Sequence, residues 1–351
     1  MDKLHVCRFE SINGITCYIN SILHILQQIP IFADYIYNYD YEYILLNKIK
    51  QTNKTVKEFV IYQLYRLIKT SLDNDNKIIT PTSFKQIIGT KNDMWNDLQH
   101  QDSQEFLTFL ISQIKEEIGI KNNYIISPIN QTTQIDKALY NIIATKEITI
   151  HQQSEYSPLT EMFDGIYENQ CSCLYCKTKN IKYEPFITVQ LDIKNNNNIY
   201  ECFDELCKTN QLDCDNKLNC NFCGIQNRAY KKTLFWKTPK ILIIHFKRFD
   251  DFLQKITNDI SYPIKNLDIS KYINPDSPYK SKYKYDLIGI NLHLSLCSDN
   301  SLTMGHYISF VKNTINDEWY IYNDSNQPIQ INKLNDLQNN NAYLLFYYRH
   351  N

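Results

Sequence analysis

The chain has 351 residues, a mass of 41.7 kDa and a formal net charge of -1, with 43% hydrophobic and 21% charged residues. A composition so close to the globular average excludes a largely disordered chain, and the length suits two domains or one large domain with lobes. Because 37 basic residues balance 38 acidic ones, no global field attracts nucleic acid or an anionic membrane.

No segment is apolar for long enough to span a bilayer, since the most apolar run, 241–246, is followed at once by Lys247 and Arg248. The N-terminus lacks the apolar core of a signal peptide. We therefore expect a protein of the cytoplasm or nucleus, in a host cell if the gene is viral. Its eleven cysteines are then metal ligands, nucleophiles or buried thiols rather than disulfides.

The N-terminal part of the chain, about 120 residues, is predicted to be mainly helical. Apolar residues recur at spacings of three and four from Ile19 to Ile29, and this run ends at Pro30. The segments 56–72 and 103–118 show the same period. These three segments are the predicted helices.

From about residue 148 the pattern changes to alternating, strand-like runs. The predicted strands are 186–193, 229–236, 240–249, 285–294, 306–312, 318–323 and 342–348, and the asparagine-rich tracts 195–198 and 339–341 are predicted loops. The order indicates a helical lobe followed by a mostly antiparallel β lobe. A cysteine-rich piece, 171–223, lies between the first strands.

Cys17 is the candidate nucleophile because it lies where a loop becomes a helix. Backbone N–H groups and the positive end of the helix dipole meet there, which predicts a stabilised thiolate with a lowered pKa. Gly14, one of only seven glycines, would let the loop turn tightly just before the helix. The alternative interpretation is a buried structural cysteine at a helix start.

A cysteine nucleophile needs a base and a group that orients the base. His306 begins one predicted strand, Asn323 ends the next one, and Asp324 follows directly. Antiparallel pairing of the two strands would place one of these two residues beside the His306 ring. Taken singly, these residues also suit a core histidine and an Asn-Asp turn, and the order Cys, His, Asn/Asp along the chain favours a catalytic set.

Two Cys-x-x-Cys pairs predict a structural zinc site with four thiolate ligands. The pairs are Cys173 with Cys176 and Cys220 with Cys223, and a β-hairpin must bring them together. Cys171 is an alternative to Cys173 as the ligand. Coincidental cysteines are the competing explanation.

Four blocks of sequence resemble the ubiquitin-specific proteases, the papain-like thiol deubiquitinases, in the order typical of that family. The blocks are NGITCYINS at 13–21, QDSQEFL at 101–107, the knuckle block at 163–223, and IHFKRF, GHY and WYIYNDS between 244 and 325. The resemblance implies an α+β fold with a helical thumb (1–155), β fingers that carry zinc (156–235) and an antiparallel β palm (236–351). Together these would form a single catalytic domain over residues 1–351.

The resemblance also implies a role for each matching residue. Cys17 is the expected nucleophile, His306 the general base, Asn323 the orienting residue and Asp324 a secondary polar partner. Asp102 and Gln104 would bind the C-terminal tail of ubiquitin, where Asp102 faces arginines of the tail; the alternative for Asp102 is an acidic helix N-terminus. Phe249 and Tyr307 would line the channel for the two terminal glycines.

Two departures from the family pattern bear on activity. Ile12 occupies the position of the family's oxyanion-binding asparagine, and Asn13 follows one residue late. A missing oxyanion donor costs about 2.7–4 kcal/mol of transition-state stabilisation unless Asn13 replaces it. The loop between His293 and His306 is also longer than usual, around 297–304, and can alter specificity. His293 is the alternative base, and His245 suits the core.

The leading hypothesis is a monomeric deubiquitinating cysteine protease that hydrolyses the thioester, isopeptide or peptide bond after the last glycine of ubiquitin. The first alternative is a catalytically impaired pseudoenzyme that binds ubiquitin, which Ile12 favours. The second is a zinc-ribbon nucleic-acid binder, which is disfavoured because no basic cluster surrounds Cys220 and Cys223 in the sequence. We expect ubiquitin and its conjugates as partners, and neither nucleic acid nor a membrane.

Overall fold

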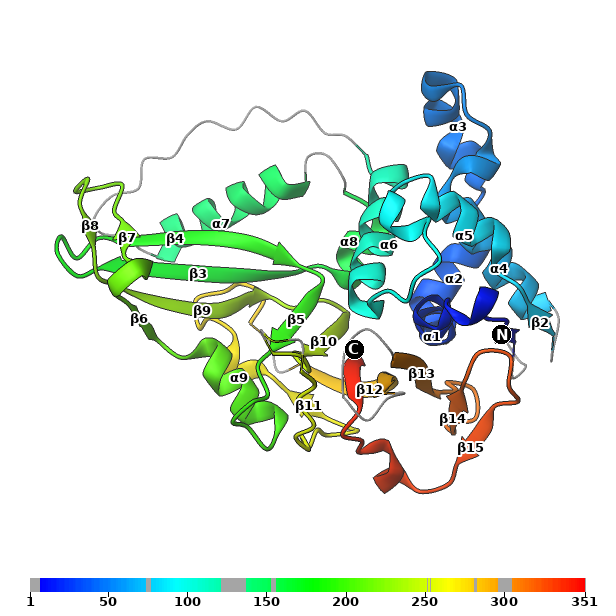
Figure 1. The fold of residues 1–351 in the computed structure, drawn as a ribbon. Helices are drawn as coiled ribbons and strands as arrows, with labels where there is room; N and C mark the ends of the chain where they lie inside the picture. The colour runs from blue at the N-terminus through cyan, green and yellow to red at the C-terminus, as the bar shows by residue number, and fades with distance from the viewer. Residues whose placement is uncertain are drawn as a thin grey trace.

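The computed structural model describes residues 7–73, 77–120, 137–152, 156–250, 252, 254–280, 283–295 and 305–350. Three parts are visible in Figure 1: a helical thumb, a long sheet that extends away from it as the fingers, and a palm sheet beneath both. None of the described helices combines the length and the apolar character that crossing a membrane requires.

The thumb is built from the N-terminal helices. They are α1 (Cys17–Leu26), α2 (Pro30–Asn38), α3 (Tyr41–Thr52), α4 (Val60–Asp73), α5 (Thr82–Gly89), α6 (Ser103–Ile118) and α8 (Pro158–Phe163), with the short parallel pair β1 (Arg8–Phe9) and β2 (Ile78–Ile79). The three predicted helices are confirmed as α1, α4 and α6, and Pro30 opens α2, a position where its missing N–H costs nothing. The Asp102 side chain caps α6, and the apolar side of that helix faces the core.

The palm is a twisted sheet with strand order β15-β14-β13-β12-β16-β10-β5, and β11 adds to β12 outside that path. Its strands are β5 (Thr188–Leu191), β10 (Ile241–Phe246), β11 (Leu267–Asp268), β12 (Lys284–Ser295), β13 (Gly305–Lys312), β14 (Trp319–Tyr322), β15 (Ile329–Ile331) and β16 (Ala342–Arg349). The pairs are antiparallel except β10 with β5. The predicted antiparallel lobe is thereby confirmed.

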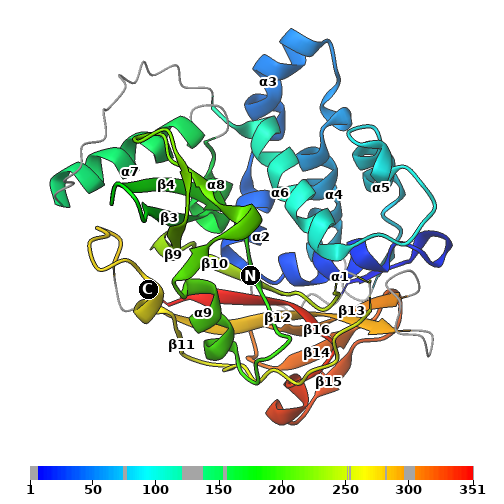
Figure 2. The ribbon, with the colours of Figure 1, turned by 60° about the vertical axis from the view of Figure 1, so that its left-hand side comes forward.

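The fingers are an antiparallel sheet of order β4-β3-β9-β6. Its strands are β3 (Gly165–Cys173), β4 (Lys179–Phe186), β6 (Asn210–Leu212) and β9 (Ala229–Lys237), and the hairpin of β7 (Leu218–Asn219) and β8 (Gln226–Asn227) lies at the tip. Helix α9 (Ile199–Cys207) follows the asparagine-rich loop and packs at the base of this sheet (Figure 2).

The prediction of one strand over 186–193 is wrong. Phe186 ends β4 in the fingers, Thr188 begins β5 in the palm, and the chain changes sheets at Ile187. Phe186 is held in the fingers because its ring stacks on Tyr167, with centroids 4.1 Å apart, and lies directly over Gly165, where no Cβ would fit. The alternation of the sequence continues through this switch and therefore does not mark it.

Helix α7 (Lys137–Gln152) was not among the predicted helices, and it covers one face of the fingers sheet (Figure 2). Its buried Ile143 and Ile148 pack with Tyr183 and Trp236 of the sheet. The Glu147 carboxylate accepts a hydrogen bond of 2.6 Å from the backbone N–H of Tyr183. Residues 137–152, within the range expected for the thumb, thus lie against the fingers.

The position of α1 is fixed by close packing on the palm. One apolar core joins the thumb helices to the upper face of the palm sheet, and a second core lies between the other face and α9. Gly289 of β12 lets α1 approach closely, because a Cβ there would lie 2.6 Å from Cγ2 of Ile25. The first residue of α1, Cys17, is therefore held at the junction of thumb and palm.

Candidate active site

Cys17 is the first residue of α1 and is almost completely buried, at 1% exposure. The preceding loop contains Gly14 at φ +74°, as expected for a tight turn that ends in the helix. The backbone N–H of Tyr307 lies close enough to the Cys17 sulfur to lower its pKa. Since Tyr307 follows His306 directly in β13, the nucleophile candidate lies beside the base candidate.

The expectation of a lowered thiol pKa is wrong. Burial raises the pKa of Cys17 to about 11, and the nearby Asp324 carboxylate raises it further, against the lowering effect of the backbone N–H groups of Tyr307, Tyr18 and Cys17 itself. The helix start does supply favourable N–H groups, but desolvation of the thiolate outweighs them. Burial of Cys17 therefore favours the neutral thiol over the thiolate.

His306 and Asn323 are hydrogen-bonded, with 2.7 Å between His306 Nε2 and Asn323 Oδ1. The contact arises because β13 and β14 are antiparallel neighbours, with Ser309 opposite Tyr322, as the sequence predicted. A side-chain amide oxygen only accepts, so this bond requires a proton on His306 Nε2. In the neutral form of the ring, Nδ1 is then the nitrogen free to accept a proton, as a general base needs.

Asp324 is further from the ring. Its Oδ2 lies 3.9 Å from His306 Nε2, while its Oδ1 accepts a hydrogen bond of 2.8 Å from Asn20. Burial raises the pKa of Asp324, against lowering by Asn20 and His306. The direct partner of the imidazole in this structure is Asn323.

Two further histidines of the palm strands, His293 and His245, do not suit the role of base. His293 is 1% exposed on β12 behind Gly305, where a Cβ would collide with its ring, and burial lowers the pKa of His293 to about 4. His245 lies in β10 with its ring edge-on to Tyr343, and burial lowers its pKa to about 4 as well. The longer loop expected around 297–304 lies outside the described residues.

The loop before Cys17 contains Ile12 and Asn13, the two residues considered for the position of the oxyanion donor. The backbone N–H of Ile12 donates to Thr16 Oγ1 at 2.9 Å, and its side chain has no donor. Asn13 is exposed and left-handed, at φ 51°. Thr16 therefore stabilises the conformation of the loop. Asn13 carries the one side-chain amide in loop residues 11–16.

Asp102 and Gln104 lie at the start of α6, where the thumb faces the palm. Asp102 Oδ1 accepts from the backbone N–H groups of Gln104 and Glu105, at 2.6 and 3.1 Å, and its Oδ2 accepts from the Tyr343 hydroxyl. Gln104 Nε2 donates to Thr188 of β5 at 3.3 Å. Asp102 is thus a helix cap, and its carboxylate is also held toward the palm.

Phe249 and Tyr307 belong to one aromatic cluster with His293 and Tyr343. The ring centroids of Phe249 and His293 are 5.3 Å apart, and those of His293 and Tyr307 are 4.8 Å apart. Tyr307 is buried within this cluster, whereas Phe249 is partly exposed at its edge. Tyr343, which joins this cluster to Asp102, was not predicted, because in the sequence it is one apolar residue of a strand and its partner lies 241 residues away.

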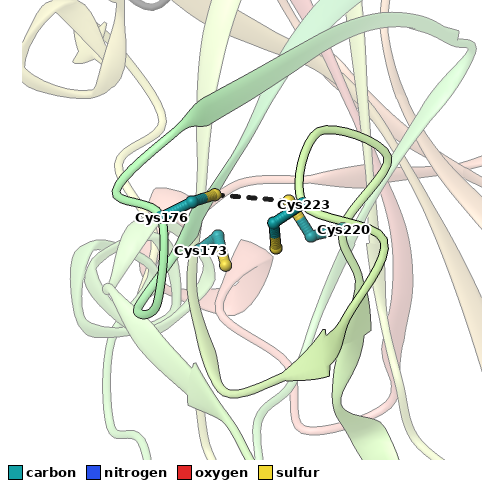
Figure 3. A group of neighbouring side chains, drawn as sticks. All are labelled: Cys173, Cys176, Cys220 and Cys223. Atoms are coloured by element: carbon teal, nitrogen blue, oxygen red, sulfur yellow. Dashed lines mark hydrogen bonds between the residues drawn. The ribbon is translucent and has the colours of Figure 1, made fainter.

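The four predicted ligand cysteines meet at the tip of the fingers (Figure 3). The sulfur atoms of Cys173, Cys176, Cys220 and Cys223 all lie within 4.8 Å of one another, which suits a metal ion bound by four cysteines. Cys171 is not part of the group, so the sequence ambiguity is resolved in favour of Cys173.

The two Cys-x-x-Cys turns have the same backbone geometry. In the first, the N–H of Lys177 donates to the Cys173 carbonyl at 3.0 Å; in the second, the N–H of Gly224 donates to the Cys220 carbonyl at 2.9 Å. Lys177 and Gly224 both have left-handed φ, at 62° and 70°. Two matched turns that present four thiols to one point fit a metal ion, which would hold the thiolate forms.

Comparison with known proteins places the chain in a family. Residues 11–347 match the family model described as ubiquitin carboxyl-terminal hydrolase. The chain is 27% identical over 365 residues to ubiquitin carboxyl-terminal hydrolase 4 of Saccharomyces cerevisiae, covering 96% of this chain and 38% of that protein. It is also 28% identical over 352 residues to a probable ubiquitin carboxyl-terminal hydrolase of Acanthamoeba polyphaga mimivirus, covering 86% and 72%. The chain thus spans well under half the length of the yeast relative.

Solved structures share the fold. Ubp8 in the SAGA DUB module bound to ubiquitin aldehyde matches with a TM-score of 0.68 at 22% identity, over 99% of this chain and 70% of that one. The same module bound to monoubiquitin gives a TM-score of 0.69 at 22% identity, again over 99% and 70%. The predicted α+β fold of thumb, fingers and palm is confirmed. The chain belongs to the ubiquitin carboxyl-terminal hydrolase family.

Proposed function

We propose that this protein is a deubiquitinating cysteine protease that hydrolyses the thioester, isopeptide or peptide bond after the C-terminal glycine of ubiquitin. The observation that carries the proposal is the 2.7 Å hydrogen bond between His306 and Asn323 in a chain of this family. It lies next to Tyr307, whose backbone N–H approaches the Cys17 sulfur at the junction of thumb and palm. The relatives named for ubiquitin hydrolysis, and the ubiquitin and ubiquitin aldehyde bound in the similar structures, support ubiquitin as the partner.

In the proposed mechanism the orientation of His306 sets the proton path. With Nε2–H donated to Asn323, Nδ1 takes the Cys17 proton as the sulfur attacks the carbonyl carbon of ubiquitin's last glycine. The imidazolium then protonates the departing amine, which leaves a thioester between ubiquitin and Cys17. Water, deprotonated by His306, attacks the thioester, and the sulfur leaves with the proton from the imidazolium as the ubiquitin carboxylate is released. The backbone N–H of Cys17 and the Asn13 amide are the proposed oxyanion donors.

We assign binding of the ubiquitin tail to the junction between the start of α6 and the palm. The Asp102 carboxylate, held by Tyr343, would pair with an arginine of the tail, and Gln104 would contact the tail backbone. Phe249 at the rim and Tyr307 beneath it would restrict the last two positions to glycine. The bulky rings of the aromatic cluster support this assignment.

We also propose that the four-cysteine cluster binds one structural zinc ion that stabilises the fingertip. Four thiols with no other ligand form a closed site, which is typical of structural rather than catalytic zinc. Metal analysis of freshly purified protein should find about one equivalent of zinc, as one four-cysteine site requires. A value well below one equivalent, with the fold intact, would exclude this site.

The remaining parts of the proposal concern organisation and location. The thumb, fingers and palm would together form a single monomeric catalytic domain, in which α7 packs on the fingers and α8 on the thumb. The protein would act in the cytoplasm or nucleus, or in a host cell if the gene is viral, because the nucleophile and the metal ligands must stay reduced. Binding of nucleic acid or membranes is not part of the proposed activity.

A ubiquitin that carries an electrophile at its C-terminus tests the proposal. The wild type should form a covalent adduct detected by mass, and Cys17→Ala should form none. The matched control is Cys202→Ala, which removes a different buried cysteine, in α9 instead of α1. It should react like the wild type. An adduct that still forms in Cys17→Ala would refute Cys17 as the nucleophile, whether or not Cys202→Ala also forms one.

The second candidate is a pseudoenzyme that binds ubiquitin without cleaving it. Ile12 in place of an oxyanion donor and the raised pKa of Cys17 favour this alternative. It predicts tight binding of unmodified ubiquitin, no adduct and no turnover of a fluorogenic ubiquitin substrate. Adduct formation with turnover would exclude it.

A further inference from the structure

Asn20 connects the helix of the nucleophile to the loop of the orienting residue. It lies three residues after Cys17 in α1 and is fully buried. Its Nδ2 donates to Asp324 Oδ1 at 2.8 Å and to the backbone carbonyl of Phe9 at 3.3 Å. The first bond spans 304 residues and runs directly from the thumb to the palm.

The direction of the Asn20 amide is determined by its neighbours. Both groups that its Nδ2 meets are acceptors, so a flipped amide would place its oxygen against a carboxylate and a carbonyl. In the observed orientation Oδ1 is buried without a hydrogen-bond partner among the described residues. A buried oxygen without a hydrogen-bond partner lowers stability. The presence of Asn20 is therefore better explained by the hydrogen bonds that its NH2 group donates than by packing.

The group it holds is next to the catalytic set. Asp324 has a left-handed backbone, at φ 46°, and one of its oxygens is engaged by Asn20. The other stays 3.9 Å from His306 Nε2, whereas Asn323 Oδ1 is at 2.7 Å. Asn20 thus anchors the loop in the position where Asn323, and not Asp324, binds the imidazole.

We propose that Asn20 is a positioning residue for the hydrolysis reaction: by binding Asp324 it sets the distance and orientation of the His306–Asn323 pair relative to Cys17. The inference rests on the proposed deubiquitinase activity. Asn20 acts through Asp324 and does not touch the substrate.

The neighbouring residue of α1 supplies a matched control. Ser21 is also buried and also bridges thumb and palm: Asn291 Nδ2 donates to Ser21 Oγ at 2.8 Å, and Ser103 Oγ donates to Asn291 Oδ1 at 2.8 Å. This second bridge does not reach Asn323 or Asp324. Ser21→Ala therefore removes a buried thumb–palm contact of similar kind without disturbing the orienting loop.

Steady-state cleavage of a fluorogenic ubiquitin substrate is the test, and the wild type is measured first. Asn20→Ala should lower kcat about tenfold and leave KM within about twofold, because ground-state binding of ubiquitin is unaffected. Ser21→Ala should retain the wild-type kcat. Asn20→Asp, which keeps the side-chain shape but places a carboxylate against Asp324, should lower kcat more than Asn20→Ala does.

A double-mutant cycle then separates positioning from general structure. If Asn20 acts through Asp324, adding Asn20→Ala to Asp324→Ala should lower kcat by less than about twofold. Additive effects, or equal losses in Ser21→Ala and Asn20→Ala, would overturn the inference. So would loss of ubiquitin binding in both Asn20 variants, which indicates a purely structural role. An inactive wild type would instead refute the proposed function.

Discussion

The state of the resting thiol leads to a quantitative prediction. Burial, with a smaller effect of the Asp324 carboxylate, raises the pKa of Cys17 from 9.0 to about 11. That increase lowers the thiolate population about 100-fold and corresponds to roughly 3 kcal/mol against ionisation. At pH 7.5 only about 0.03% of the sulfur would be thiolate, compared with about 3% for an unperturbed thiol. Asp324→Asn removes the nearby negative charge and should therefore lower the pKa of Cys17.

Alkylation by iodoacetamide, followed by peptide mass, measures this directly. Because the thiolate is the reactive form, the rate at Cys17 should rise continuously from pH 7 to pH 10 without a plateau at neutral pH. Asp324→Asn should react faster than the wild type at every pH in this range. The exposed Cys214 in the same molecule serves as an internal reference for reagent activity. Cys17→Ala confirms the assignment of the modified peptide.

The contrary result is a Cys17 rate that reaches a plateau between pH 5 and pH 7. Such a profile indicates a thiolate already paired with a protonated His306, as expected from the helix start alone. It would show that the backbone N–H groups near Cys17 outweigh desolvation, and the reasoning from burial would be refuted. A slower reaction in Asp324→Asn than in the wild type would contradict the assigned effect of that carboxylate.

Four further predictions follow from the site. Ile12→Asn should raise kcat by about 10- to 100-fold if an oxyanion donor is missing, and an unchanged kcat would indicate that Asn13 already supplies it. Asn323→Ala should lower kcat on the order of 100-fold because the imidazole loses its partner at 2.7 Å, and a loss under twofold would argue against this assignment. Tyr343→Phe should raise KM about tenfold with kcat little changed, since it removes the donor that holds Asp102; a pure kcat effect in steady-state kinetics would contradict it. Cys176→Ser should lower the zinc content and lower Tm by about 5 °C or more in a thermal scan, and an unchanged Tm would argue against a structural ion.

Local patterns explain which elements could be predicted. The period of 3.6 residues identified α4 and α6, which each bury one side, and alternation identified most strands of the palm. Helix α1 shows the same apolar period, although it is buried on all sides. Helix α9 was missed because it is short and interrupts a strand-rich region, and α7 because its sequence shows no strong apolar side. The switch of sheets at Ile187 was missed because an alternating pattern is compatible with either sheet.

Some features of the candidate site could also be predicted from the sequence. The order of Cys17, His306 and Asn323 and the spacing of the four knuckle cysteines are properties of the chain itself, so the sequence was sufficient to indicate a cysteine protease with a metal site. The antiparallel pairing of β13 and β14 could also be anticipated, because the two strands follow each other in the chain and are joined by a short connection, residues 313–318. These predictions depend on residue types and on local pairing rules.

Only the tertiary structure decided how these groups behave. The pKa of Cys17 depends on how completely α1 is covered by the palm, and a sequence motif does not report desolvation. The contacts of Asp102 with Tyr343 and of Asn20 with Asp324 join residues separated by 241 and 304 positions. Such hydrogen bonds arise when two independently predictable lobes pack together, and their geometry is set by the shape of the whole core rather than by any segment of the chain.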